Sequence, residues 1–116
     1  DRHAHEYGDV SPINKNVAEP GMIFSIEPGI YIEGSHGVRL ENELLVCEGE
    51  KNEYGEFLYF EPITYVPFDL DAINPDIMNA EDKERLNTYH ATVYEKVSPY
   101  LNDEEKEWLK KYTRAI

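Results

Sequence analysis

The sequence changes character near residue 68, and this change constrains the fold more than any other feature. Residues 1–68 alternate short runs of β-branched and aromatic residues with Pro and Gly turn signals, a pattern typical of strands. Residues 69–116 show apolar positions at helical spacing instead. Strands followed by helices predict an α+β fold. The expected strands cover residues 22–27, 30–32, 38–47 and 57–66, with a polar loop at 48–55.

Two helices are expected in the second region. Asn79 can cap the first helix, with Asp82 three positions later, and Pro99 ends it. Asn102 and Glu105 repeat this capping pattern. Because isolated helices under about 12–15 residues are marginal in water, we expect their apolar stripes to pack together or against the sheet. The stripes are Leu86, Tyr89, His90, Val93 and Val97, and then Trp108, Leu109, Tyr112 and Ile116.

Composition limits the partners. The 24 acidic against 11 basic residues give a net charge of −13, and repulsion from phosphate argues against a nucleic acid. No apolar run approaches the roughly 20 residues that span a bilayer, so no membrane partner is expected. The single cysteine, Cys47, excludes an internal disulfide and fits a cytoplasmic setting. The chain has 116 residues and starts without Met, which favours a fragment of a longer protein.

Two glutamates occupy unusual positions. Glu27 follows a strand-like run and precedes a Pro-Gly turn, and Glu41 lies among apolar residues of the expected strand 38–47. The period of two in a strand places Arg39, Glu41 and Glu43 on one face. A carboxylate buried alone is costly, so such residues need a cation or hydrogen-bond donors. Spacing leaves two interpretations open, a metal site or carboxylates that pair with arginine or face solvent.

The stretches Gly-Met-Ile-Phe-Ser-Ile-Glu-Pro-Gly-Ile-Tyr at 21–31 and Gly-Val-Arg-Leu-Glu-Asn at 37–42 resemble the aminopeptidase P and prolidase family, which has the pita-bread fold. The resemblance implies that Glu27 is a ligand of one metal ion and that Glu41 bridges two. His5 matches a histidine that hydrogen-bonds the substrate and the developing oxyanion. Arg39 and Tyr31 match residues that orient the ligands and help to bind the substrate. Glu43 matches no ligand of the family.

The likeness extends through most of the chain. Residues 57–67 resemble the closing strand of aminopeptidase P, and segments at 86–90 and 107–109 resemble its helical extension. Residues 1–68 are thus expected to be the C-terminal part of a pita-bread catalytic domain, and residues 69–116 a helical C-terminal extension. The implied activity of the intact enzyme is the removal of an N-terminal residue that precedes proline. The implied cofactors are two divalent metal ions, with Mn²⁺ expected.

The family's other ligands, two aspartates and a histidine, lie upstream of the matched motifs. The missing upstream half is therefore the expected partner, and this chain alone is expected to be inactive. Formation of a homo-oligomer stays open. Two alternatives remain: a prolidase that acts on dipeptides, against which the helical extension argues, and a binding module that keeps the fold without metals. The upstream sequence would decide between enzyme and binding module.

Overall fold

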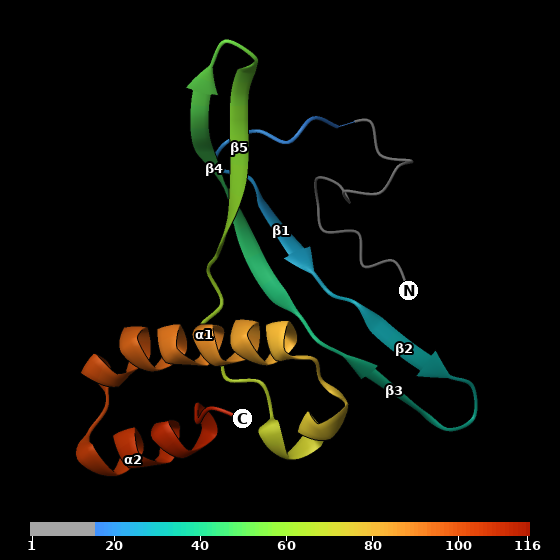
Figure 1. Ribbon diagram of the computed structural model, residues 1–116, viewed down its shortest axis with the longest axis vertical. Coiled ribbons are helices and arrows are strands. Elements are labelled where there is room, and N and C mark those ends of the chain that lie inside the picture. Colours follow the sequence, from blue (N-terminus) through green and yellow to red (C-terminus); the bar gives the residue numbers. More distant parts are fainter. Residues whose placement is uncertain (1–15) are drawn as a thin grey trace. The chain divides into compact units, whose positions relative to one another are not determined.

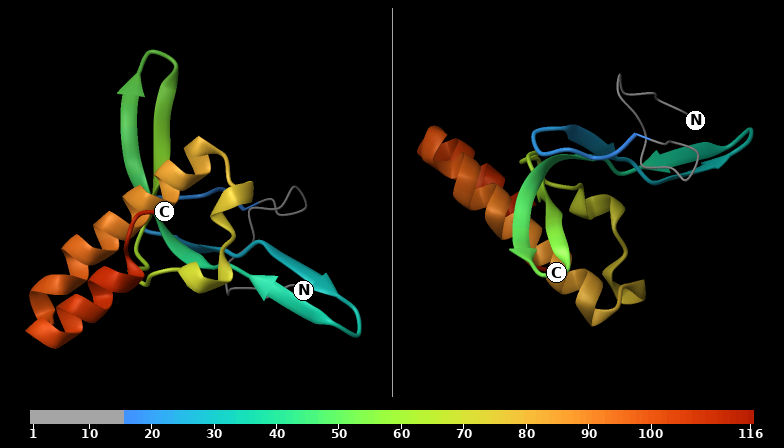
Figure 2. Two further views of the ribbon diagram at one scale, coloured as in Figure 1. Left: turned by 60° about the horizontal axis from the view of Figure 1, so that its bottom comes forward. Right: turned by 90° about the horizontal axis from the view of Figure 1, so that it is seen from above.

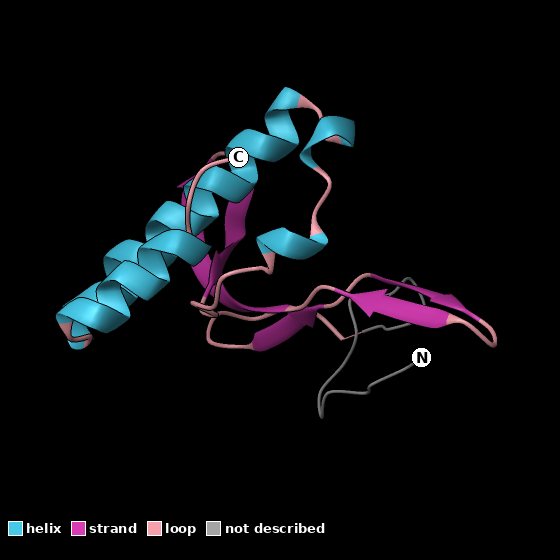
Figure 3. Ribbon diagram, turned by 90° about the horizontal axis from the view of Figure 1, so that it is seen from below, coloured by secondary structure: helices cyan, strands magenta, loops and turns pink. Residues whose placement is uncertain are grey.

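The computed structural model describes residues 16–116 (Figure 1). By its internal contacts the chain divides into two compact units that meet between Thr64 and Tyr65. The described part of the first unit contains only strands and turns, whereas the second contains helices and loops (Figure 3). Strands followed by helices agree with the predicted α+β class. The boundary lies slightly before the change of character seen in the sequence near residue 68.

Two antiparallel sheets make up the described part of the first unit. The larger has the strand order β1-β4-β5, with β1 at Ile23–Ile26, β4 at Asn42–Asn52 and β5 at Gly55–Pro62. The smaller sheet pairs β2 (Gly29–Ile32) with β3 (His36–Arg39). β5 lies at an edge, and its final proline therefore removes no hydrogen bond from the interior of the sheet.

The two sheets share one long ribbon. β1 leads into β2 along one side of this ribbon, and β3 leads into β4 along the other (Figure 1). Ile26 faces Asn42 where the larger sheet ends, and Gly29 faces Arg39 where the smaller sheet begins. The register therefore passes from one sheet to the other without a shift. The residues between the sheets are thus also opposite one another across the ribbon.

The prediction of a single strand at residues 38–47 is wrong at Leu40 and Glu41, which lie between β3 and β4. The cause lies on the opposite side of the ribbon. Pro28 accepts a hydrogen bond from the Leu40 N–H at 3.2 Å, but a proline has no N–H to donate in return. The ladder loses one bond at this point, and both sides of the ribbon are interrupted together.

The prediction of a polar loop at residues 48–55 is also wrong for most of this segment. β4 continues to Asn52 and β5 begins at Gly55, so the turn is confined to the two residues between them. A β-bulge interrupts the register before Lys51, which then faces Glu56 and forms an ion pair with it. Cross-strand pairing thus extends β4 through a segment whose polar composition favours a loop.

The strands bury little apolar surface. Among the described residues of the first unit, Val46 is the one apolar side chain that is fully buried, at 2% exposed. The exposed residues 57–60 follow one another along β5, and successive strand residues point to opposite faces, so both faces of β5 are open. Exposed apolar surface of this extent is typical of protein contact surfaces. The exposed large apolar side chains on the strands are Ile23, Ile26, Ile30, Tyr31, Ile32, Val38, Phe57, Leu58, Tyr59 and Phe60.

The second unit is a helical hairpin. α1 (Ala80–Val97) and α2 (Asp103–Tyr112) run antiparallel and side by side (Figures 1 and 2). Short 3₁₀ turns precede and join them, η1 at Leu70–Ala72, η2 at Pro75–Ile77 and η3 at Ser98–Tyr100. Over the part of the chain that the structure describes, no helix combines the length and the apolar character needed to cross a membrane.

Both predicted helix caps are confirmed. The Asn79 side chain accepts a hydrogen bond from the Asp82 N–H at 2.8 Å and so satisfies a free donor of the first turn of α1. Asn102 and Glu105 form a reciprocal capping box, in which each side chain accepts from the other residue's N–H at 2.9 and 2.8 Å. These local bonds fix where each helix begins.

The apolar stripes of the helices are buried in part. Val93 of α1 is fully buried and Leu109 of α2 is 3% exposed, as expected for stripes that pack. Trp108, in contrast, is 58% exposed and stacks on Tyr112 of its own helix, with ring centroids 4.5 Å apart. The second stripe therefore uses Leu109 rather than Trp108 as its buried residue.

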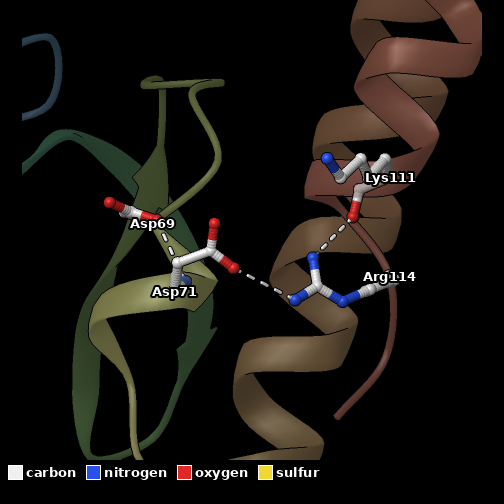
Figure 4. Close-up of polar contacts among 4 residues, drawn as sticks. All are labelled: Asp69, Asp71, Lys111 and Arg114. Carbon is white, nitrogen blue, oxygen red and sulfur yellow. Dashed lines mark hydrogen bonds and ion pairs between the residues drawn. The ribbon is translucent and has the colours of Figure 1, made fainter.

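Two polar contacts hold the end of the chain within this unit. The Arg114 guanidinium donates to the Lys111 carbonyl at 2.9 Å and lies 3.5 Å from the Asp71 carboxylate (Figure 4). The Asn87 side chain donates to the Ile116 carbonyl at 3.2 Å and accepts from the Ile116 N–H at 3.0 Å. In the second contact, the Asn87 side chain of α1 thus pairs with both the N–H and the carbonyl of Ile116.

His90 is the buried polar residue of α1. Its ring is fully buried, and its Nε2 accepts a hydrogen bond from the Phe68 N–H at 3.0 Å, so the neutral ring has its proton on Nδ1. That Nδ1 has no hydrogen-bond partner among the described residues. The rings of Phe68 and Tyr89 lie close to the imidazole, with centroids 6.5 and 5.8 Å away. Burial lowers the pKa of His90 below its ordinary value because the charged form loses its hydration.

We expect the helical unit to lose stability as the pH falls below about 6.5, the ordinary pKa of histidine. The unfolded chain protonates His90 more readily than the folded chain does, so unfolding takes up a proton and acid favours it. Thermal melting at pH 7.5 and pH 5.5 measures this difference. His90→Gln is the matched variant, because Gln can accept the Phe68 N–H and does not titrate. An equal loss of stability in both proteins over this range would contradict the prediction.

Candidate metal site at the break in the ribbon

Glu27 and Glu41 lie at the interruption between the two sheets. The continuous register places them directly opposite each other, one on each side of the ribbon. The Cβ atoms of such opposed residues are about 4.5–5.5 Å apart, and like charges at that separation destabilise the pair. The opposed carboxylates therefore need a positive group or hydrogen-bond donors close by.

Arg39 supplies one such group. Its Nη1 lies 3.7 Å from Glu27 Oε2, and its Nε lies 3.9 Å from Glu41 Oε2. These long separations, between side chains that are 37%, 23% and 40% exposed, make weak ion pairs. The Ser25 hydroxyl donates to Glu27 Oε1 at 3.1 Å. Arg39 thus neutralises the pair in part without engaging either carboxylate closely.

Tyr31 lies two residue pairs further along the ribbon than Arg39. In β2 it faces Gly37 of β3, and Gly29 precedes it by two residues on the same face. A Cβ atom added at Gly29 would lie 2.7 Å from the Tyr31 hydroxyl oxygen, and one at Gly37 would lie 2.6 Å from Cδ1 of the ring. The tyrosine ring therefore lies flat over these two glycines.

The described residues predicted to form the site come together on one face of the ribbon. Glu27, Tyr31, Arg39 and Glu41 occupy alternate positions along the two sides of the ribbon, and the continuous register aligns these positions. The fifth predicted residue, His5, lies outside the described residues 16–116. Its position therefore stays a prediction.

Two features of this face were not predicted from the sequence. One is the Ser25 hydroxyl that donates to Glu27, and the other is the pair of glycines under Tyr31. Ser25 and Gly29 lie two residues before the side chains that they contact, so the period of two would have found them. The contact with Gly37 depends on the strand register, for which the sequence gives no local signal.

The chemistry of the donors fits a hard divalent cation. Glu27 and Glu41 offer carboxylate oxygens, which Mg²⁺, Ca²⁺ and Mn²⁺ prefer as ligands. Among residues 16–116, however, no group of three or more His, Cys, Asp or Glu side chains lies close enough to hold a metal ion. Within this part of the chain, the two glutamates can therefore form only part of a metal site.

Comparison with known protein families shows which family has sequences similar to this chain. Residues 2–48 match metallopeptidase family M24, and residues 56–116 match the C-terminal region of peptidase M24. The chain belongs to metallopeptidase family M24. The first M24 match contains Glu27, Tyr31, Arg39 and Glu41, and the second contains both helices. The resemblance drawn from the two motifs is confirmed.

The relatives of this M24 chain are much longer. It is 37% identical to Xaa-Pro aminopeptidase 2 of Homo sapiens in a match that covers 97% of the chain and 17% of the relative. It is 38% identical to aminopeptidase P1 of Arabidopsis thaliana, with 90% of the chain and 17% of the relative covered. The chain thus spans about a sixth of the length of these M24 relatives.

A solved structure supports the predicted fold of this M24 chain. It is the crystal structure of the X-prolyl aminopeptidase of Caenorhabditis elegans, described as a cytosolic enzyme with a di-nuclear active site. The match has a TM-score of 0.71 and 28% identity, and it covers 85% of this chain and 17% of that one. The predicted fold class, the C-terminal part of a pita-bread domain followed by helices, is confirmed.

Proposed function

We propose that the full-length protein is a metal-dependent Xaa-Pro aminopeptidase. The observation that supports this most is the opposed pair Glu27 and Glu41, flanked by Arg39, in a chain whose relatives are named Xaa-Pro aminopeptidases. Two opposed carboxylates destabilise a sheet unless a cation lies between or beside them. Arg39 lies 3.7 and 3.9 Å from the two carboxylates and neutralises the pair only in part, so a bound metal ion would supply the remaining positive charge.

Each residue of this face has a role in the proposed enzyme. Glu27 would hold one divalent ion and Glu41 would bridge two. Bound divalent ions activate water as a nucleophile near neutral pH and polarise the substrate carbonyl. Arg39 would orient the carboxylates, Tyr31 would help to bind the substrate, and His5 would donate a hydrogen bond to the oxyanion as it forms. Mn²⁺ is the proposed metal because oxygen donors suit it, although they also suit Mg²⁺.

The proposal extends to the organisation of the protein. Residues 1–68 would complete a pita-bread catalytic domain with an upstream half of the same protein, which would supply the remaining ligands. Residues 69–116 would form the helical extension of that domain. The substrates would be peptides with proline at the second position. We propose a cytoplasmic location, in keeping with the single cysteine and with the cytosolic relative from Caenorhabditis elegans.

Purified full-length protein, tested with Mn²⁺, should release the first residue of a peptide with proline at its second position. A matched peptide with alanine at that position is the specificity control, and a chelator should remove the activity. Equal cleavage of the two peptides would contradict proline specificity. Cleavage of dipeptides alone would instead identify a prolidase, and failure to bind metal would favour a binding module.

We expect His5→Ala in the full-length protein to lower turnover while leaving the metal content nearly unchanged. The proposed role of His5 is to stabilise the oxyanion, and removal of one such donor typically costs about 10²–10³-fold in kcat. Metal analysis and steady-state kinetics on the same preparation measure both quantities. A large loss of bound metal would instead make His5 a ligand.

A further inference from the structure

The flat position of the Tyr31 ring depends on two glycines. At Gly37 an added Cβ would meet the near edge of the ring, with Cδ1 at 2.6 Å and Cε1 at 3.2 Å. At Gly29 it would meet the far end, with the hydroxyl oxygen at 2.7 Å and Cζ at 2.8 Å. Real Cβ contacts are essentially never this short, so any residue larger than glycine at either position would displace the ring.

The backbone does not explain these glycines. Positive φ angles, which favour glycine, occur at Gly21, Gly34 and Gly55 among the described glycines. Gly29 and Gly37 are strand residues in β2 and β3 and are not among them. An alanine could therefore adopt the backbone conformation of either position. What glycine provides there is the space that the tyrosine ring fills.

The ring also points in a definite direction. Because its hydroxyl end lies against Gly29, the side chain leans back along β2 toward the interruption. Gly29 faces Arg39 across the ribbon, and Arg39 lies near both glutamates. The two glycines thus direct the phenol toward the carboxylate pair. If either glycine were replaced by a larger residue, the half-exposed ring could move out toward solvent.

We infer that Gly29 and Gly37 are positioning residues, which seat the Tyr31 ring so that its hydroxyl faces the Glu27 and Glu41 site. They touch no substrate and act through the tyrosine. This deepens the proposed function, and its kinetic consequence rests on that function. The glycines set the geometry of the site but add little to the stability of the fold, because a displaced ring can move into solvent.

The position of the ring can be tested without any assay of activity. Full-length protein with 3-fluorotyrosine at position 31 gives a ¹⁹F NMR signal that reports the surroundings of the ring. We expect Gly29→Ala and Gly37→Ala each to shift this signal while changing the thermal midpoint little. Val38→Ala is the matched control, because Val38 is next to Gly37 and points to the other face. A signal that neither glycine variant moves would overturn the proposed seat.

A double-mutant cycle tests the functional consequence. Displacement of a positioned group by about 1 Å can cost up to about 100-fold in rate, so we expect each glycine variant to lower kcat/KM by about 10- to 100-fold at unchanged metal content. In a Tyr31→Ala background the same changes should have almost no further effect, because the residue through which they act is gone. Additive losses would overturn the positioning role.

The two measurements separate the two proposals. If the wild-type protein does not cleave Xaa-Pro peptides, the proposed function and the kinetic role both fail, whereas the ¹⁹F signal still decides whether the glycines seat the ring. If cleavage occurs and the losses are additive, the function holds and the positioning role is overturned. Supporting both proposals requires cleavage, a shifted signal and losses that disappear without Tyr31.

Discussion

Glu41→Gln in the full-length protein should abolish metal-dependent cleavage of Xaa-Pro peptides and lower the amount of bound metal. Gln keeps the size of the side chain but removes the charge that would bridge two cations. Loss of an outer partner of a metal ligand already costs about 10- to 100-fold in affinity or activity, and loss of a bridging ligand should cost more. Metal analysis of the purified variant and its steady-state turnover check this prediction.

Glu43→Gln is the matched control for this variant. Glu43 lies two residues further along the same side of the ribbon and, like Glu41, is exposed. Its backbone N–H donates to the Thr64 hydroxyl at 2.8 Å, a bond that the substitution leaves in place. We expect the Glu43→Gln variant to keep both metal and turnover. Normal turnover with two bound ions in the Glu41→Gln variant would show that Glu41 is not a ligand.

The 116-residue chain by itself should not cleave Xaa-Pro peptides at any Mn²⁺ concentration. Its described residues provide a pair of opposed carboxylates but no group of three ligands. Such a pair binds a cation weakly, because water must fill the remaining positions and the geometry is unrestrained. Addition of the separately purified upstream half, which should supply the missing ligands, is expected to restore turnover.

We also expect the isolated chain to associate with itself, because its strands are exposed. Apolar side chains on both faces of β5 would be covered in a complete catalytic domain, whereas the isolated chain exposes them to water. Sedimentation of the chain at several concentrations, with and without the upstream half, would reveal any self-association. Steady turnover by the chain alone, proportional to its concentration and removed by a chelator, would falsify the prediction of inactivity.

Local signals in the sequence were sufficient to predict where the two helices of the second unit begin. Asn79 and Asn102 are followed three residues later by Asp82 and Glu105, and both caps form as expected because each joins groups within one helical turn. The helical spacing does not determine which residue of a stripe is buried. Trp108 and Leu109 are neighbours in one apolar stripe, and only the packed structure decides that Leu109 is the buried one.

The sequence by itself determined that strands precede helices, where the helices begin, and which two glutamates are the candidate metal ligands. These features depend on residues close together in the chain or on motifs that family members share. Only the tertiary structure showed that Pro28 interrupts the opposite side of the ribbon at Leu40, and that Glu27 directly faces Glu41. Strand register sets both features. Register joins residues far apart in the sequence, and it therefore leaves no local signal.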